Sequence, residues 1–400
     1  MKALKNPGIT LPLGFKANGI ACGLKKSGKP DLALIYSLVP ATAAAVFTKN
    51  AVKAAHIMVD AKHLRFGEAQ AIIVNSGNAN CCTGARGIKD AQLVVTELAA
   101  SLEVLPSRCL MASTGVIGKY LKTEKILAAI PQLIKGLGFD GSDAANQAIM
   151  TTDKFPKQAT VRFSMGKKTV TIAAMAKGAG MICPDMATML CFVTTDANIS
   201  LPGLRKALKL AVDASFNCIS VDGEMSTNDS VFVLANGLAE NKLIGTSGPG
   251  FEQFCAGLTQ VCLKLAKMVV EDGEGATKVI EMRVEGAATQ AQAKQAALRL
   301  ANSPLIKTMI AGENPNWGRI PAAIGAAGVK MNPDKLSVEL QGKTVYQNSV
   351  SKVTDLDILV PLLRSKDIVI RVKLFSGKYS QTMWASDLTH EYITINTEYN

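Results

Sequence analysis

The segment Lys177-Gly178-Ala179-Gly180-Met181-Ile182-Cys183-Pro184-Asp185-Met186-Ala187-Thr188-Met189-Leu190 joins two strand-like parts of the chain. A stretch with two glycines leads into a proline-containing segment, and Thr188 then opens an apolar run that extends to Thr195. By composition alone, Thr188 is an ordinary β-branched residue of a strand. The segment therefore predicts a glycine-rich loop that ends where a buried strand begins.

Outward from this segment, strand-like and helix-like patterns alternate without a repeating period. Short apolar runs and hairpin patterns predict strands over Asp31–Ser37, Ala71–Val74, Ala159–Phe163, Thr169–Met175, Thr188–Thr195, Thr277–Glu285, Leu336–Tyr346 and Ile368–Ser386. Spacing of three to four residues predicts helices over Gly87–Val104, Thr123–Lys135 with Thr123 as N-cap, Leu201 to about Ala214 after Ser200, and Phe251–Glu271. We expect an α/β fold of the α+β, mixed-sheet kind, with two or three packed substructures in 400 residues.

Composition and charge narrow the class of function. Hydrophobic residues make up 48% of the chain, and no run approaches the roughly 18 apolar residues of a membrane span. The net charge of +12 is spread along the chain, and aromatic residues are only 5%, which argues against a nucleic-acid partner. A diffuse positive field instead suits an anionic small substrate, such as a dicarboxylic amino acid.

Cysteine and histidine usage argues against disulfides and metal chemistry. The nine cysteines form no C-x-x-C pair, and several lie in apolar runs, as reduced thiols do. With only three histidines, a histidine-based triad or a zinc site is disfavoured. We expect a cytoplasmic protein, because the N-terminal residues also lack the apolar core of a secretory signal.

The common motifs of nucleotide-binding proteins and hydrolases do not account for the function of this chain. Residues Gly136–Gly141 match G-x-G-x-x-G, but they follow a predicted helix instead of a strand, so Gly136 and Gly138 are better interpreted as helix termination. The chain has neither a P-loop motif nor a G-x-S-x-G motif.

Six polar loops punctuated by glycine are the remaining candidates. They are Asn75–Asn80, Ser113–Gly115, Lys177–Gly180, Asp222–Asp229, Glu271–Gly275 and Glu313–Arg319. Each alone is more often a turn, but functional groups concentrate on loops held by a rigid scaffold. Thr114 and Gly115 offer backbone N–H groups to a developing oxyanion. Glu274 follows the long predicted helix between two glycines, from where its carboxylate can reach a cleft.

Several of these blocks, in order, resemble the ornithine acetyltransferase family, also called bifunctional glutamate N-acetyltransferase or ArgJ. The resemblance covers nearly the whole chain, and its most specific part ends in Met186-Ala187-Thr188-Met189-Leu190. The matching blocks are Asn75–Asn80 with Thr83-Gly84, Ala112–Gly115, Met150–Asp153, Lys177–Leu190, Ser226–Asp229, Glu271–Lys278, Ala311–Arg319 and Asp387–Asn396.

The resemblance implies a layered ArgJ/DmpA-like fold of a self-cleaving N-terminal-nucleophile enzyme. It implies a cut between Ala187 and Thr188, giving an α chain of residues 1–187 and a β chain of 188–400 in an α2β2 heterotetramer. The β chain would contain a smaller C-terminal subdomain from about 280 to 400. The implied roles are nucleophile for Thr188, oxyanion hole for Thr114 and Gly115, and substrate contacts for Thr151, Lys177, Glu274 and Asn396.

The implied reaction moves an acetyl group from N-acetylornithine to glutamate in arginine biosynthesis, without a metal or bound cofactor. Acetyl-CoA is a further candidate donor. The family ends with Ser or Thr five residues after the asparagine that matches Asn396, whereas this chain ends four residues after it, so Asn400 is the candidate for that contact. Two alternatives stay open: an N-terminal-nucleophile aminopeptidase or amidase, and a non-catalytic basic binding protein in which Thr188 is structural.

Overall fold

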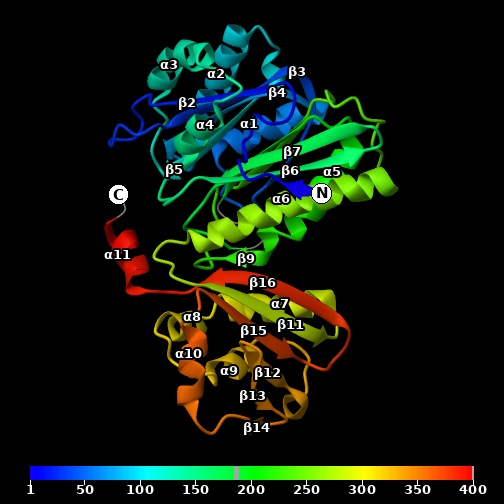
Figure 1. Cartoon of the computed structure of the whole chain (residues 1–400). Helices are drawn as coiled ribbons and strands as arrows, with labels where there is room; N and C mark the ends of the chain where they lie inside the picture. Colours follow the sequence, from blue (N-terminus) through cyan, green and yellow to red (C-terminus); the bar gives the residue numbers. More distant parts are fainter. Residues whose placement is uncertain (184–188, 399–400) are drawn as a thin grey trace. The chain divides into compact units, whose positions relative to one another are not determined.

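The computed structural model describes residues 1–183 and 189–398, and the chain divides into two compact units (Figure 1). Unit 1 comprises Met1–Gly178, Asp185–Asn217 and Met225–Val269. Unit 2 comprises Ala179–Pro184, Cys218–Glu224 and Val270–Asn400. The chain therefore passes from one unit to the other directly after Lys177 and Gly178.

Unit 1 is built on a large mixed sheet with the strand order β1-β6-β7-β8-β10-β3-β4-β5, and β2 also pairs with β3. Its strands are β1 Lys2–Ala3, β2 Phe15–Ile20, β3 Leu32–Phe47, β4 Glu68–Asn78, β5 Cys109–Val116, β6 Lys157–Met165, β7 Lys168–Lys177, β8 Leu190–Thr195 and β10 Ser230–Ala235. Its helices are α1 Ala55–His63, α2 Gly84–Leu102, α3 Thr123–Lys135, α4 Ser142–Ile149, α5 Leu201–Asp213 and α6 Pro249–Glu271, whose last residues enter unit 2.

Alternation along β3 and β4 gives this sheet two buried faces. Leu32, Leu34 and Ile73 pack in one apolar cluster with residues of α2 and α3, whereas Ala33 and Ile72 pack in a second cluster that includes residues of α4. Successive strand residues point to opposite faces, so a continuous apolar run fits a sheet covered on both sides. The buried runs predicted from the sequence have this physical origin.

Unit 2 is built on a second mixed sheet with the order β14-β13-β12-β15-β11-β16-β9, of which β15, β11 and β16 lie side by side in Figure 1. The strands are β9 Ile219–Ser220, β11 Val279–Ala287, β12 Ser337–Leu340, β13 Lys343–Gln347, β14 Val350–Ser351, β15 Asp367–Lys373 and β16 Tyr379–Ser386. The helices are α7 Gln290–Ala301, α8 Pro304–Ala311, α9 Arg319–Gly325, α10 Val360–Leu363 and α11 His390–Glu398. One apolar cluster joins the sheet to α7, α8 and α9.

The predicted fold class is confirmed, because both sheets combine parallel and antiparallel pairs. The predicted strands Ala159–Phe163 and Thr169–Met175 are confirmed as parts of β6 and β7, which pair antiparallel. The start of α5 is confirmed as well, since the Ser200 side chain accepts a hydrogen bond from the Gly203 N–H, as an N-cap does. Gly136 is the C-cap of α3, which confirms helix termination there.

Three details of the predicted elements are wrong. Lys122, not Thr123, is the N-cap of α3, because Thr123 already has helical backbone and no side chain caps this end. Helix α2 ends at Leu102 instead of Val104, because Glu103 adopts a left-handed conformation with φ of 55°. The predicted strand range Ile368–Ser386 contains two strands, β15 and β16, which do not pair with each other because β11 lies between them, parallel to the first and antiparallel to the second.

Each helix within residues 1–183 and 189–398 lacks the length or the apolar character that a membrane crossing requires.

Candidate active site

Three strand ends of unit 1 lie in a row and frame the segment that the sequence singled out. Lys177, the last residue of β7, is the register partner of Leu190, the first residue of β8. Leu190 in turn pairs with Ser230, the first residue of β10. The predicted cleavage residues Ala187 and Thr188 lie outside the described residues. The strand expected from Thr188 begins at Leu190, since Met189 is described and lies before it.

A buried carboxyl group, Asp229, holds the first described residue after the predicted cut. Its Oδ1 accepts a hydrogen bond from the Met189 N–H at 3.1 Å, and its Oδ2 has no hydrogen-bond partner among the described residues. Burial raises the pKa of Asp229 well above its ordinary value, although the Met189 N–H, the Ser226 hydroxyl and the charge of Lys177 oppose the shift. Asp229 is therefore bonded to the residue that directly follows the expected nucleophile in the sequence.

An amide network joins this edge to the end of β5. The Asn228 side-chain amide donates to the carbonyl oxygens of Ala79 and Ser113, both at 2.7 Å. The Ser113 hydroxyl donates to Asn75 Oδ1 at 2.6 Å, and the Asn75 amide donates to the Asn78 carbonyl at 2.9 Å. Because these side chains are buried, each unmade bond would leave a polar group without water, so the network fixes the two strand ends.

Thr114 and Gly115 follow Ser113 directly on β5. Thr114 is buried, and Gly115 has a φ of 131°, a backbone angle that residues with a side chain rarely adopt. A Cβ at Gly115 would lie 2.4 Å from the Gly77 carbonyl carbon and 2.6 Å from the Asn78 nitrogen. The backbone of β4 therefore approaches so closely that only glycine fits, and the main chain of these two residues is rigidly placed.

Two further predicted residues, Thr151 and Lys177, lie around the carboxylate of Asp153. Asp153 Oδ2 accepts from the Thr151 N–H at 2.9 Å, and Oδ1 accepts from the Gly178 N–H at 2.7 Å. Oδ1 also pairs with Lys157 Nζ at 2.7 Å, and both side chains of this pair are 0% exposed. Burial alone would raise the pKa of Asp153, but the positive charges of Lys177 and Lys157 and the hydrogen bonds outweigh it and hold the pKa well below the ordinary range.

A third lysine, Lys25, shares this electrostatic environment. Burial lowers the pKa of Lys25 to about 8; the charge of Lys177 lowers it further, whereas the charges of Asp31 and Asp153 oppose the shift. Its Cγ would lie 3.2 Å from a Cβ added at Gly77, which places Lys25 beside the β4 end of the amide network. This part of unit 1 is therefore positively charged and partly shielded from water, which suits a carboxylate ligand.

In unit 2 the structure brings together the other two predicted contacts. The Asn396 side-chain amide on α11 donates to Glu274 Oε2 at 2.9 Å and to the Tyr392 carbonyl at 2.9 Å. The Glu274 N–H donates to the Ala179 carbonyl at 2.9 Å. Glu274 is half-buried and Asn396 exposed, so the carboxylate is partly open to solvent, from where a cationic group can approach it. Asn400 lies outside the described residues.

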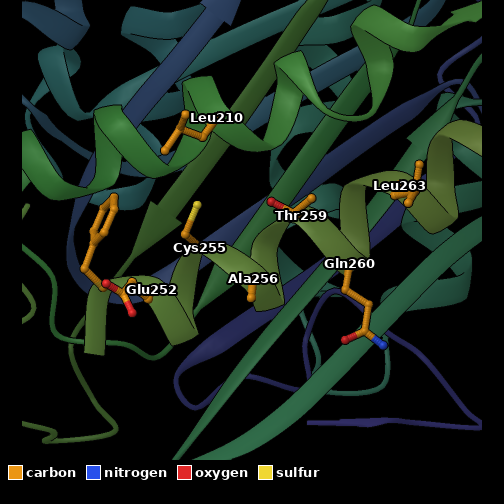
Figure 2. A pocket seen from close by; sticks show the side chains of 8 residues that line it. Leu210, Glu252, Cys255, Ala256, Thr259, Gln260 and Leu263 are labelled. Atoms are coloured by element: carbon orange, nitrogen blue, oxygen red, sulfur yellow. The ribbon is translucent and has the colours of Figure 1, made fainter. Parts of the chain in front are cut away.

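A separate cavity of about 600 Å³ lies along α5 and α6 of unit 1 (Figure 2). Figure 2 shows Leu210 of α5 facing a row of α6 side chains that includes Cys255 and Leu263. Its lining is almost entirely apolar and includes none of the predicted site residues. Among the described residues, Glu252 is its one charged lining residue, so the cavity offers no cationic partner to the carboxylate of an amino-acid substrate.

The sequence did not assign a role to Asp153, Lys157, Asn228 or Asp229. Asp153, Asn228 and Asp229 lie inside blocks that resemble the family, and this position was the one signal in the sequence that could have indicated them. Lys157 carried none, since nothing in its neighbourhood predicts a fully buried lysine. Within the described residues, no group of three or more His, Cys, Asp or Glu side chains is arranged to hold a metal ion.

Solved structures and characterised sequences resemble this chain. The crystal structure of an ornithine acetyltransferase complexed with ornithine, from Mycobacterium tuberculosis, is 40% identical, covers 46% of this chain and 97% of that chain, and has a TM-score of 0.43. The arginine biosynthesis bifunctional protein ArgJ of Symbiobacterium thermophilum is 45% identical over 98% of both chains. The protein of the same name from Caldanaerobacter subterraneus is also 45% identical over 98% of both chains.

The family model of ArgJ matches residues 16–400, nearly the whole sequence. This match and the two relatives confirm the family that the sequence blocks had indicated. The chain belongs to the ArgJ family.

Proposed function

We propose that this chain is an ornithine acetyltransferase of arginine biosynthesis that moves an acetyl group from N-acetylornithine to glutamate. Membership of the ArgJ family and 45% identity to bifunctional ArgJ proteins over 98% of the chain support the activity. The observation that carries the residue assignments is the row of Lys177, Leu190 and Ser230, with the buried Asp229 bonded to Met189. This row frames the segment in which Thr188 stands.

The nucleophile is Thr188, freed at its amine by a cut after Ala187. A threonine hydroxyl is almost entirely protonated near neutrality, whereas a free α-amine has a pKa of about 7.7–8.0 and is a suitable general base. The hydroxyl oxygen attacks the acetyl carbonyl of N-acetylornithine while the amine takes the hydroxyl proton. The C–N bond then breaks, ornithine leaves with that proton, and acetyl-Thr188 remains.

In the second half-reaction the amine of glutamate attacks the ester carbonyl, and N-acetylglutamate leaves as the Thr188 oxygen regains a proton. Both steps pass through a tetrahedral oxyanion, which Thr114 and Gly115 stabilise. The rigid backbone at Gly115 supports this role, because an oxyanion hole requires donors that are already in place before the charge develops.

Charged groups bind the substrates. Lys177 pairs with a substrate carboxylate, and Thr151 is a further contact held by the same Asp153 carboxylate. Glu274 binds a substrate ammonium group, with Asn396 orienting its carboxylate and Asn400 as the last candidate contact. A dicarboxylic acceptor and a diamino donor thereby each find a partner of opposite charge.

The mature enzyme consists of an α chain of residues 1–187 and a β chain of 188–400, with a smaller C-terminal subdomain from about 280 to 400, in an α2β2 heterotetramer. It requires no bound cofactor, and acetyl-CoA is a candidate second donor. We place it in the cytoplasm, where reduced thiols persist, since none of the nine cysteines, all of which are among the described residues, forms a disulfide.

The cut is tested by intact-mass analysis and a denaturing gel of the purified protein. We expect two fragments ending and beginning at Ala187 and Thr188, and one band near 42 kDa for Thr188→Ala. Thr188→Ser is the matched control, because it keeps the hydroxyl and should still be cut. Two fragments from Thr188→Ala would refute the nucleophile.

The transfer is tested by incubating the enzyme with N-acetylornithine in the presence and absence of glutamate. We expect N-acetylglutamate with glutamate and little free acetate without it. Acetate released at equal rates in both mixtures would instead indicate the aminopeptidase or amidase alternative, in which water attacks the acyl-enzyme.

A further inference from the structure

Residues 179–183, the last described residues before the predicted cut, are bonded to other residues of unit 2. The Ala179 carbonyl accepts the Glu274 N–H at 2.9 Å, and the Ile182 carbonyl accepts the Val221 N–H at 2.9 Å. Gly180 lies so close to Glu274 that an added Cβ would be 2.4 Å from the Glu274 Cδ. This segment, which ends four residues before Ala187, is therefore held firmly.

One side chain, Asp222, supplies two of these bonds. Its Oδ2 accepts from the Met181 N–H at 2.6 Å, and its Oδ1 accepts from the Ile182 N–H at 2.8 Å. Hydrogen bonds to a carboxylate are roughly twice as strong as those between neutral groups. Asp222 also accepts from the Glu224 N–H at 3.2 Å, so its own loop holds the carboxylate in place.

The residue that Asp222 holds has an unfavourable backbone. Met181 has a φ of 59°, in the left-handed region that costs a residue with a Cβ free energy. The preceding Gly180 does not relieve this cost, because the conformation belongs to Met181 itself. The two hydrogen bonds to Asp222 compensate for this cost, since the N–H groups of Met181 and Ile182 can both point at its carboxylate in this turn.

The charged groups around Asp222 come from three other elements. Lys307 of α8 lies close enough for Asp222 to oppose the lowering of the Lys307 pKa by burial. Glu274 acts on Asp222 as a like charge, and the Tyr392 hydroxyl of α11 donates to Asp222 Oδ2 at 3.4 Å. A nearby cation and three N–H donors thus keep a half-buried carboxylate bound to the loop.

We propose that Asp222 is a positioning residue for self-cleavage, because it fixes the left-handed turn at Met181 that leads into the cut. The proposal rests on the proposed function, in which Thr188 Oγ attacks the Ala187 carbonyl. The peptide C–N bond breaks as the acyl group moves to oxygen, and water then opens the ester to an Ala187 carboxylate and a free Thr188. Asp222 acts upstream of the reacting bond, by holding the chain at Met181 and Ile182.

The same bonds acquire a second role after the cut. Met181 and Ile182 then belong to the α chain, whereas Asp222 and Val221 belong to the β chain. The carboxylate becomes a contact between two polypeptides and retains the new C-terminal tail of the α chain on unit 2.

The test measures how fast the full-length chain is cut. Chains labelled in a short pulse of cell-free synthesis are chased, and the uncut band is followed on a denaturing gel. We expect Asp222→Ala to slow cleavage about 10- to 100-fold, the effect of losing charge-assisted hydrogen bonds. Asp222→Asn keeps one acceptor and should fall between Asp222→Ala and the unaltered chain.

A rescue variant separates positioning from general loss of structure. Met181→Gly removes the cost of the left-handed turn, so Asp222→Ala with Met181→Gly should be cut severalfold faster than Asp222→Ala alone. Asp355→Asn is the matched control: Asp355 accepts the Asp357 N–H at 2.9 Å in an exposed turn of unit 2, and its loss should leave the cleavage rate unchanged. Melting temperatures show which variants are folded. If Asp222→Ala does not fold, the cleavage rate of Asp222→Asn is compared with that of the unaltered chain instead.

The outcomes distinguish this proposal from the proposed function. If the unaltered chain is never cut, the proposed function fails and the positioning role fails with it. If the unaltered chain is cut and the folded Asp222 variants are cut equally fast, only the positioning role is refuted. Slow cleavage that Met181→Gly does not accelerate would refute the role of the left-handed turn.

Discussion

The Asp153–Lys157 pair offers a sharp test of how unit 1 holds its predicted substrate contacts. Asp153→Asn removes the charge that faces Lys157 Nζ at 2.7 Å, and both side chains are 0% exposed. Breaking a buried pair from one side costs about 3–5 kcal/mol, because the remaining charge stays buried without compensation. The neighbouring Lys177 enlarges this cost, since it also lowers the pKa of Asp153.

That cost corresponds to a fall in melting temperature of roughly 6–15 °C for a unit of this size. It should also raise the KM for N-acetylornithine, because Asp153 accepts the N–H groups of Thr151 and Gly178. Calorimetry of the purified variant and steady-state kinetics measure the two effects. Asp213→Asn is the matched control: Asp213 pairs with Lys209 on the exposed surface of α5, where loss of the charge should leave the melting temperature unchanged.

The pH dependence gives a second measurement on the same variant. The folded pKa of Asp153 is lower than the unfolded value of about 3.9, so its stabilisation is fully present above that value and is lost as the pH falls towards the folded pKa. The difference in stability between the two proteins should therefore be constant above about pH 5 and shrink in more acidic solution. Equal melting temperatures of Asp153→Asn and the unaltered protein at pH 7 would refute the reasoning.

Three further perturbations follow from single contacts. Gly115→Ala should lower kcat at least about 100-fold in protein that still folds, because the added Cβ meets the β4 backbone at 2.4 Å and shifts the oxyanion donors. Gly180→Ala should displace the Glu274 carboxylate from Asn396 and raise the KM for N-acetylornithine severalfold, with a small change in melting temperature. His56 is buried and its pKa is lowered to about 3 by that burial, so the unaltered protein should lose stability as the pH falls below about 6.5, and His56→Gln should lack this part of the loss.

Kinetic assays at saturating glutamate measure the two glycine variants, and melting temperatures from pH 4 to pH 8 measure the histidine variant. Gly118→Ala is a control for the first, because it also has positive φ but an added Cβ would meet no atom within 4 Å. Full activity of Gly115→Ala would contradict the assigned oxyanion hole. An unchanged KM for Gly180→Ala would contradict the role of Glu274, and a parallel pH profile for His56→Gln would show that His56 is not the titrating group.

Local chemistry along the sequence determined much of this protein. Apolar runs and three-to-four spacing located the four longest described helices and the main strands of both sheets, because those periods follow from backbone geometry alone. Most of the shorter helices were not predicted. Ser200 marked the start of α5 through a bond three residues away, and Gly136 marked the end of α3. The resemblance of whole blocks to the ArgJ family identified Thr188 and Lys177 as candidates, whereas Glu274 was also indicated by its place between two glycines after a long helix.

Only the tertiary structure decided which of these groups meet. Sheet register sets Lys177 opposite Leu190, and it brings Gly178 to Asp153, 25 residues earlier in the chain. The same holds for Asp222, which reaches Met181 across 41 residues. A carboxylate in the sequence carries no information about its distant partner, because that partner is chosen by the packing of whole strands and helices. The sequence alone thus identifies the candidate reacting groups, whereas the fold determines their ionisation, burial and rigidity.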